Sequence, residues 1–258
     1  MLGKLMKYEF KATGRIFLPL FGALLIVALI NRVFIELNFK VPMIIGTTMS
    51  SFMIGAVCVV ALVLTIQRFY RNLLKSEGYL MFTLPVTADG LIWSKLIVAA
   101  VWTVVSFVAV MLAILLMTAD SRTLQYIQDA IISIILGIKE FGFQAILCMV
   151  ESIVLMAETL LCGILLVYTC LALSLLVNKH RIGFAFLMYI VITTLLQVVA
   201  AIGVELFRFV DICALIEHMS SFGQIQTALG AYFLAITIPG AIFYFLTRYM
   251  LQRKLNLE

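Results

Sequence analysis

Two glutamates, Glu151 and Glu158, lie seven residues apart inside a long apolar run. That spacing corresponds to about two helical turns, so a helix would present both carboxylates on one face. Carboxylates inside a membrane are costly and commonly have a function, here lining or gating a polar translocation path. Alternatively, the start of this run projects beyond the bilayer and the two side chains are simply solvated. Glu158 lies deeper in the run than Glu151 and is the better candidate for the path.

The other residues that could perform chemistry form no catalytic or metal-binding pattern. His180 and His218 are far apart, and the sequence has neither an HExxH zinc pair nor a GxSxG nucleophile motif. The five cysteines form no CxxC pair and fit ordinary packing better than a metal site. A GxxxxGK[ST] phosphate loop is also absent. We therefore expect a protein that is not an enzyme, with no catalytic residues, no metal and no bound cofactor.

The composition predicts the elements that must position these residues. Hydrophobic residues make up 64% of the 258 residues and charged residues only 12%, whereas about a quarter of a soluble domain is charged. A helix needs about 20 apolar residues to cross a bilayer, and the alternation typical of barrel strands is absent. The sequence thus predicts an all-α, polytopic membrane protein with one transmembrane domain over residues 1–258. Its six predicted spans are approximately 16–37, 43–66, 91–117, 144–177, 182–204 and 227–247.

The positions of Lys and Arg predict the orientation of these spans. With six spans, both termini lie on the same side of the membrane, and that side carries 13 of the 18 basic residues. Basic residues concentrate in cytoplasmic loops. We therefore expect a multi-pass protein of the cell membrane with both termini in the cytoplasm, together with the connections at 68–90 and 178–181.

Three segments outside the predicted spans are amphipathic. The first, residues 1–15, carries apolar residues at helical spacing with lysines between them, which is typical of a helix lying on the cytoplasmic leaflet. Residues 124–138, on the external side, have isoleucines on one face and polar side chains on the other. Residues 205–218 have a similar character. These segments are expected to lie at the membrane surface.

The connection between the second and third spans, RFYRNLLKSEGYLMFTLPVTADGLIWSK, is basic at both ends and apolar in the middle. Its central part, 77–85, combines a glycine that allows a turn, large apolar side chains and a closing proline. Such an apolar patch needs either the membrane surface or a groove in another protein. The residues expected to make this contact are Glu77, Gly78, Tyr79, Leu80, Phe82 and Pro85.

This connection resembles that of type-2 ABC exporter permeases, particularly those of Gram-positive bacteria. The N-terminal amphipathic segment, the six spans and the lack of nucleotide-binding motifs are similar to that family over nearly the whole chain. The resemblance implies that 77–85 is a coupling helix, which docks in a groove of a separate ABC ATPase subunit that binds the ATP. It also implies a second permease chain, identical or homologous, as a partner within the lipid bilayer.

Two classes of function remain open. The first is the permease subunit of an ATP-driven exporter. Because the spans carry few charges, its cargo would be hydrophobic or amphipathic, such as a lipid-like molecule, a peptide antibiotic or a drug. The alternative is a non-transporting membrane protein, such as an immunity or sensor component. A neighbouring gene for an ATPase would favour the first class. We expect no nucleic-acid partner.

Overall fold

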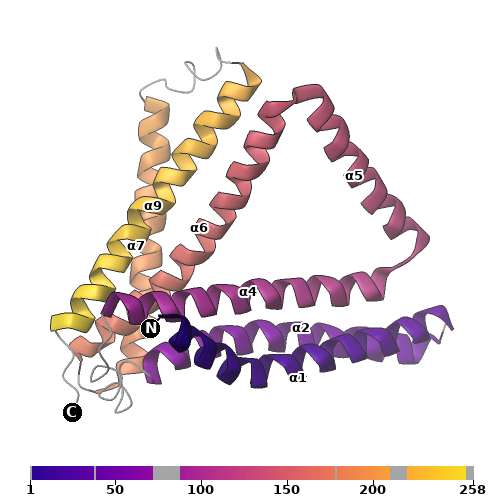
Figure 1. Cartoon of the computed structure of the whole chain (residues 1–258), viewed down its shortest axis with the longest axis horizontal. Coiled ribbons are helices and arrows are strands. Elements are labelled where there is room, and N and C mark those ends of the chain that lie inside the picture. The colour runs from indigo at the N-terminus through magenta and orange to yellow at the C-terminus, as the bar shows by residue number, and fades with distance from the viewer. Residues whose placement is uncertain (1, 38, 72–87, 178, 210–219, 254–258) are drawn as a thin grey trace. The chain divides into compact units, whose positions relative to one another are not determined.

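The computed structural model is helical throughout the parts of the chain it describes, which are residues 2–37, 39–71, 88–177, 179–209 and 220–253, apart from short turns and connections. The predicted all-α fold is confirmed for these residues (Figure 1). A short 3-10 helix, Ser174–Leu176, follows α6. The α-helices of the described residues are α1 (Leu2–Glu36), α2 (Lys40–Phe69), α4 (Ala88–Thr118), α5 (Ser121–Phe141), α6 (Phe143–Leu173), α7 (Arg181–Phe209) and α9 (Ser221–Arg253).

Six of these helices, all except α5, are long and apolar enough to cross a membrane. The predicted number of candidate spans is therefore confirmed for the described residues. The fourth span is one long helical stretch, Phe143–Leu176, of 34 residues, in agreement with the length of its apolar run. Most of the helices extend a few residues beyond the predicted spans, because a charged residue ends an apolar run without ending a helix.

Helix α1 joins the predicted N-terminal amphipathic segment to the first span without interruption. Lysine, arginine and glutamate are good helix formers, so the charged residues before position 16 continue the helix, and Pro19 lies within it. Thr13 and Gly14 are buried, and this part of α1 packs against α4. The expectation that residues 1–15 lie on the cytoplasmic leaflet stays a prediction.

The chain forms two compact units, with a boundary inside α5 after Leu136. In the first unit, α1 packs against both α2 and α4, and α2 also contacts α4 (Figure 1). In the second unit, α6 packs against α7 and α9. The expectation of a single domain over residues 1–258 stays a prediction. The core of the first unit consists of Phe17, Phe21, Leu24, Ala28, Val57, Leu64, Ala109 and Ala113.

Serine and threonine hydroxyls within the apolar helices donate hydrogen bonds to backbone carbonyls one turn earlier on the same helix. On α2, Thr48 Oγ1 donates to the Ile44 carbonyl and Ser50 Oγ to the Gly46 carbonyl, both at 2.8 Å. Ser106 of α4 makes the same kind of bond at 2.7 Å. No water is available in a bilayer core to satisfy polar groups, and this local bond is the usual solution for serine and threonine in helices. The spans therefore tolerate these residues without partners on other helices.

Helix α5 ends at Gly142, which has a backbone φ of 56°. This left-handed conformation favours glycine, and the Gly142 N–H donates to the Ile138 carbonyl at 2.9 Å. The amphipathic segment 124–138 is thus helical, with apolar side chains such as Ile131 and Ile134 exposed. Of the other predicted amphipathic segment, 205–218, the part up to Phe209 forms the end of α7 and the remainder lies outside the described residues.

The predicted orientation can be tested by cysteine labelling in a variant whose native cysteines are replaced by alanine. A cysteine in place of Lys139 is expected to react with a membrane-impermeant maleimide in intact cells. A cysteine in place of Lys179 is expected to react only after lysis. The reason is the unequal distribution of basic residues between the two sides. Labelling of the first variant only after lysis would contradict the orientation.

Candidate functional site

The predicted ATPase-coupling residues lie outside the residues that the structure describes. The described residues before this segment end at Arg71, just after α2, and those after it begin at Ala88, the first residue of α4. The candidate site therefore consists of side chains on either side of this segment and of the predicted path residues. The coupling residues concerned are Glu77, Gly78, Tyr79, Leu80, Phe82 and Pro85.

Three charged side chains from three different helices meet in the first unit. Lys95 Nζ of α4 lies 2.8 Å from Glu9 Oε1 of α1, and Arg68 Nη1 of α2 lies 3.7 Å from Glu9 Oε2. The Lys95 side chain is only 3% exposed and that of Glu9 is 11% exposed. Removing one partner of a buried ion pair typically costs about 3–5 kcal/mol. These three residues, termed the Glu9 cluster, therefore hold α1, α2 and α4 together.

Helices α1 and α4 are also joined by aromatic packing. The Trp102 ring of α4 stacks on Phe17 with a centroid distance of 4.8 Å and an interplanar angle of 12°. Phe10 and Phe21 flank the same ring, each with a centroid distance of 6.3 Å. Gly14 permits this approach, since a Cβ there would lie 3.3 Å from the Trp102 ring. The contact extends over about three turns of α1, so the two helices are held as a pair.

The Glu9 cluster was not predicted from the sequence. Two signals could have indicated it: Glu9 is an acidic residue in a basic segment, and Lys95 lies inside a predicted span. Each is also compatible with an ordinary charge near a helix end. The two residues are 86 positions apart, and only the packing of α1 against α4 brings them together.

In the second unit, both predicted path glutamates of α6 bond to polar side chains of α9. Gln226 Nε2 donates to Glu151 Oε2 at 2.8 Å, and Thr237 Oγ1 donates to Glu158 Oε1. The later residue on α6 meets the later residue on α9, so the two helices run parallel. These two pairs are termed the polar seam. Their role in a translocation path stays a prediction.

Glu158 has an unused acceptor. Its Oε2 is buried and has no hydrogen-bond partner within the described part of the chain. An unsatisfied buried polar atom costs about 1–3 kcal/mol, and more when charged. A hydrogen-bond donor placed against this oxygen would therefore be stabilised.

A third polar contact lies further along the same interface. The hydroxyls of Thr169 on α6 and Thr247 on α9 are 3.0 Å apart, and Thr169 Oγ1 also lies 3.1 Å from the Phe243 carbonyl. Both threonines are fully buried. This contact holds the two helices together beyond the polar seam.

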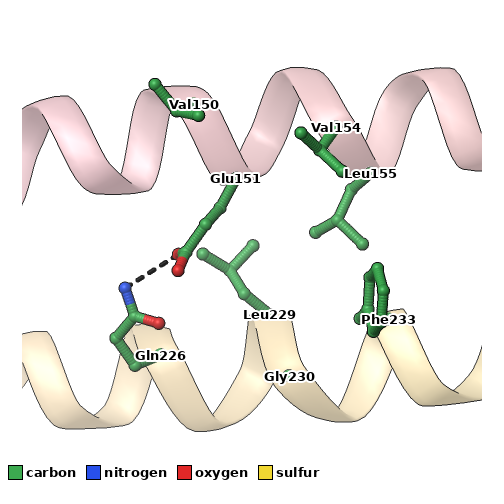
Figure 2. A pocket seen from close by; sticks show the side chains of 8 residues that line it. All are labelled: Val150, Glu151, Val154, Leu155, Gln226, Leu229, Gly230 and Phe233. Carbon is green, nitrogen blue, oxygen red and sulfur yellow. Dashed lines mark hydrogen bonds between the residues drawn. The ribbon is translucent and has the colours of Figure 1, made fainter.

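A pocket of about 340 Å³ lies between α6 and α9 beside the first pair of the polar seam. Figure 2 shows Glu151 reaching from α6 toward Gln226 at one end, with Leu155 and Phe233 at the other. Only the carboxylate and the amide are polar among the side chains of the lining. Its lining residues are Val150, Glu151, Val154, Leu155, Gln226, Leu229, Gly230 and Phe233.

Among the residues that the structure describes, no three His, Cys, Asp or Glu side chains are close enough together to hold a metal ion. The cysteines of these residues are free thiols, at Cys58, Cys148, Cys162 and Cys170. Cys148 Sγ lies 3.9 Å from Gln226 Nε2, beside the pocket.

The chain matches no protein-family model, no curated protein and no solved structure. The described residues of the chain provide six helices able to span a membrane, a buried charge cluster joining three of them, and a polar seam beside an apolar pocket.

Proposed function

We propose that this chain is the permease subunit of an ATP-binding cassette exporter, driven by a separate ATPase subunit. The observation that carries the proposal is the Glu9 cluster. Arg68 precedes segment 72–87 in the sequence and Lys95 follows it, and both side chains contact the same carboxylate of α1. A displacement of the connection between α2 and α4 would therefore be passed to three helices at once.

In this proposal, residues 77–85 form the coupling helix and dock in a groove of the ATPase. Both termini and this connection lie in the cytoplasm, with the first turns of α1 at the cytoplasmic leaflet. Closure of the ATPase on ATP displaces the coupling helix. The buried ion pair and the Trp102 stack resist separation of α1 from α4, so both helices follow.

The proposed translocation path runs along the polar seam, with Glu151 and Glu158 as its polar groups. Six helices supply half of an exporter, and a second permease chain, identical or homologous, completes it with two-fold symmetry as the default. The cargo is hydrophobic or amphipathic, because the seam offers few polar groups besides these carboxylates. Supporting this choice, the adjoining pocket is largely apolar.

The proposal is tested by replacing both Tyr79 and Phe82 with alanine in the complex of this chain with the proposed ATPase subunit. Aromatic anchors at an interface centre commonly contribute 2 kcal/mol or more, so we expect a decrease of at least about tenfold in coupled ATP hydrolysis, or loss of the ATPase from the purified complex. Membrane insertion should be unchanged.

In the matched control variant, alanine replaces Tyr126 and Phe141. These are two exposed aromatic side chains of α5 on the predicted external side. This variant should keep its ATPase subunit and its coupled activity. Full assembly and full coupling in the Tyr79 and Phe82 double variant would show that 77–85 is not the coupling element.

A further inference from the structure

The pocket between α6 and α9 is open to the surface of the second unit. Leu155 is buried at 6% exposure, whereas Val150, Val154 and Phe233 are between 41% and 53% exposed. A small molecule can therefore reach the lining without separating the two helices. The volume of about 340 Å³ falls within the range of about 300–1,000 Å³ that is typical of ligand pockets.

Glu151 gives this pocket a negative charge that no cation of the described residues balances. Its Oε2 accepts one hydrogen bond, from the neutral amide of Gln226. Within the described residues, no lysine or arginine forms an ion pair with it. A carboxylate beside apolar side chains is stabilised by a cation that also donates hydrogen bonds. The pocket is thus complementary to an ammonium or guanidinium group.

We propose that this pocket binds an amphiphilic organic cation. Its ammonium group contacts the Glu151 carboxylate, and the side-chain carbonyl of Gln226 accepts a second hydrogen bond from it. Its apolar part packs against Leu155, Leu229 and Phe233, which line the other end (Figure 2). The binding site stands on the pocket alone, whereas its identity as the cargo site rests on the proposed export function.

Other classes of ligand fit this lining poorly. A metal ion takes about four to eight ligands, and the lining offers one carboxylate and one amide. An anion would be repelled by Glu151. A sugar would leave hydroxyl groups against apolar side chains without hydrogen-bond partners, which is costly.

The test uses the purified full chain in phosphatidylcholine nanodiscs, without an ATPase. Three radiolabelled probes with the same chain length differ only in their head group: octylammonium, octanol and octanoate. Saturable binding is measured above that of empty nanodiscs. Because a charged hydrogen-bonded contact is made by the amine alone, we expect octylammonium to bind at least about tenfold more tightly than octanol. Octanoate should show no saturable binding.

Two variants separate the charge of the pocket from its volume. Glu151→Gln should weaken octylammonium binding at least about tenfold and leave octanol binding unchanged. Gly230→Leu should weaken the binding of both octylammonium and octanol, because the leucine side chain fills the pocket. A Cβ at Gly230 meets no heavy atom within 4 Å, so this variant is expected to fold. Glu140→Gln, the same charge change at the exposed end of α5, is the control and should affect neither probe.

Equal affinities for octylammonium and octanol, or unchanged octylammonium binding in Glu151→Gln, would overturn the proposal. Replacing half of the phosphatidylcholine by phosphatidylethanolamine should leave the affinity unchanged. If it abolishes binding, the pocket belongs to a lipid amine and the free cation is ruled out. Since no ATPase is present, failure of this test leaves the exporter proposal standing, and failure of the Tyr79 and Phe82 test leaves the binding site standing.

Discussion

Replacement of Lys95 by methionine is expected to lower the free energy of unfolding by about 3–5 kcal/mol. Methionine is similar in length to lysine but is apolar and lacks the ammonium group. In Lys95 this group lies 2.8 Å from Glu9 Oε1. Arg68 Nη1 lies farther from the Glu9 carboxylate, at 3.7 Å, and the Arg68 side chain is 29% exposed. Arg68 therefore compensates the buried negative charge of Glu9 only in part. The measurement is the unfolding of the purified chain on titration with sodium dodecyl sulfate, followed by tryptophan fluorescence.

Two further variants test whether this loss comes from the ion pair. Lys139→Met removes an exposed lysine of α5 and should leave the unfolding midpoint unchanged. The double variant Glu9→Leu with Lys95→Met should recover most of the lost stability, because well-packed apolar residues commonly replace a buried ion pair without loss. If the unfolding midpoint of Lys95→Met equals that of the unmodified chain, the Glu9 cluster does not hold α1, α2 and α4 together.

Replacement of Gly46 by alanine is expected to destabilise the contact between α1 and α2. Alanine is normally better than glycine in a helix by about 1 kcal/mol. Here, however, the added Cβ would lie 2.2 Å from Asn31 Oδ1 and 2.8 Å from its Cγ. Asn31 is completely buried and has little room to move. Overpacking of this kind costs about 1–3 kcal/mol, so the usual gain should become a loss in the same unfolding measurement.

Gly55→Ala provides the matched control on the same helix. A Cβ at Gly55 meets no heavy atom within 4 Å, so this substitution should be neutral or stabilising. Adding Asn31→Ala to Gly46→Ala should restore stability, since it removes the side chain that causes the clash. If Gly46→Ala and Gly55→Ala change the free energy of unfolding by the same amount, α1 and α2 are not packed as described.

The sequence alone was sufficient to predict the class of the fold and its six spans. The reason is that the thickness of a bilayer sets a minimum length for an apolar run, and this length can be counted locally. The continuity of the first helix was not predicted. The amphipathic helix expected over residues 1–15 and the span expected from about residue 16 form one helix, α1, which begins at Leu2, because helix propensity rather than hydrophobicity decides where a helix begins and ends.

The contacts that make up the candidate site were decided by the tertiary structure. Glu151 was identified from the sequence, but its partner Gln226 was not, and the pairs Glu9–Lys95 and Asn31–Gly46 were not predicted at all. The partners of the first two pairs are 75 and 86 positions apart. One residue along a helix turns the side chain by about 100°, and spans that are apolar on every side carry no pattern that selects the face in contact. The rotation of each helix, and hence each partner, follows only from packing against its neighbours.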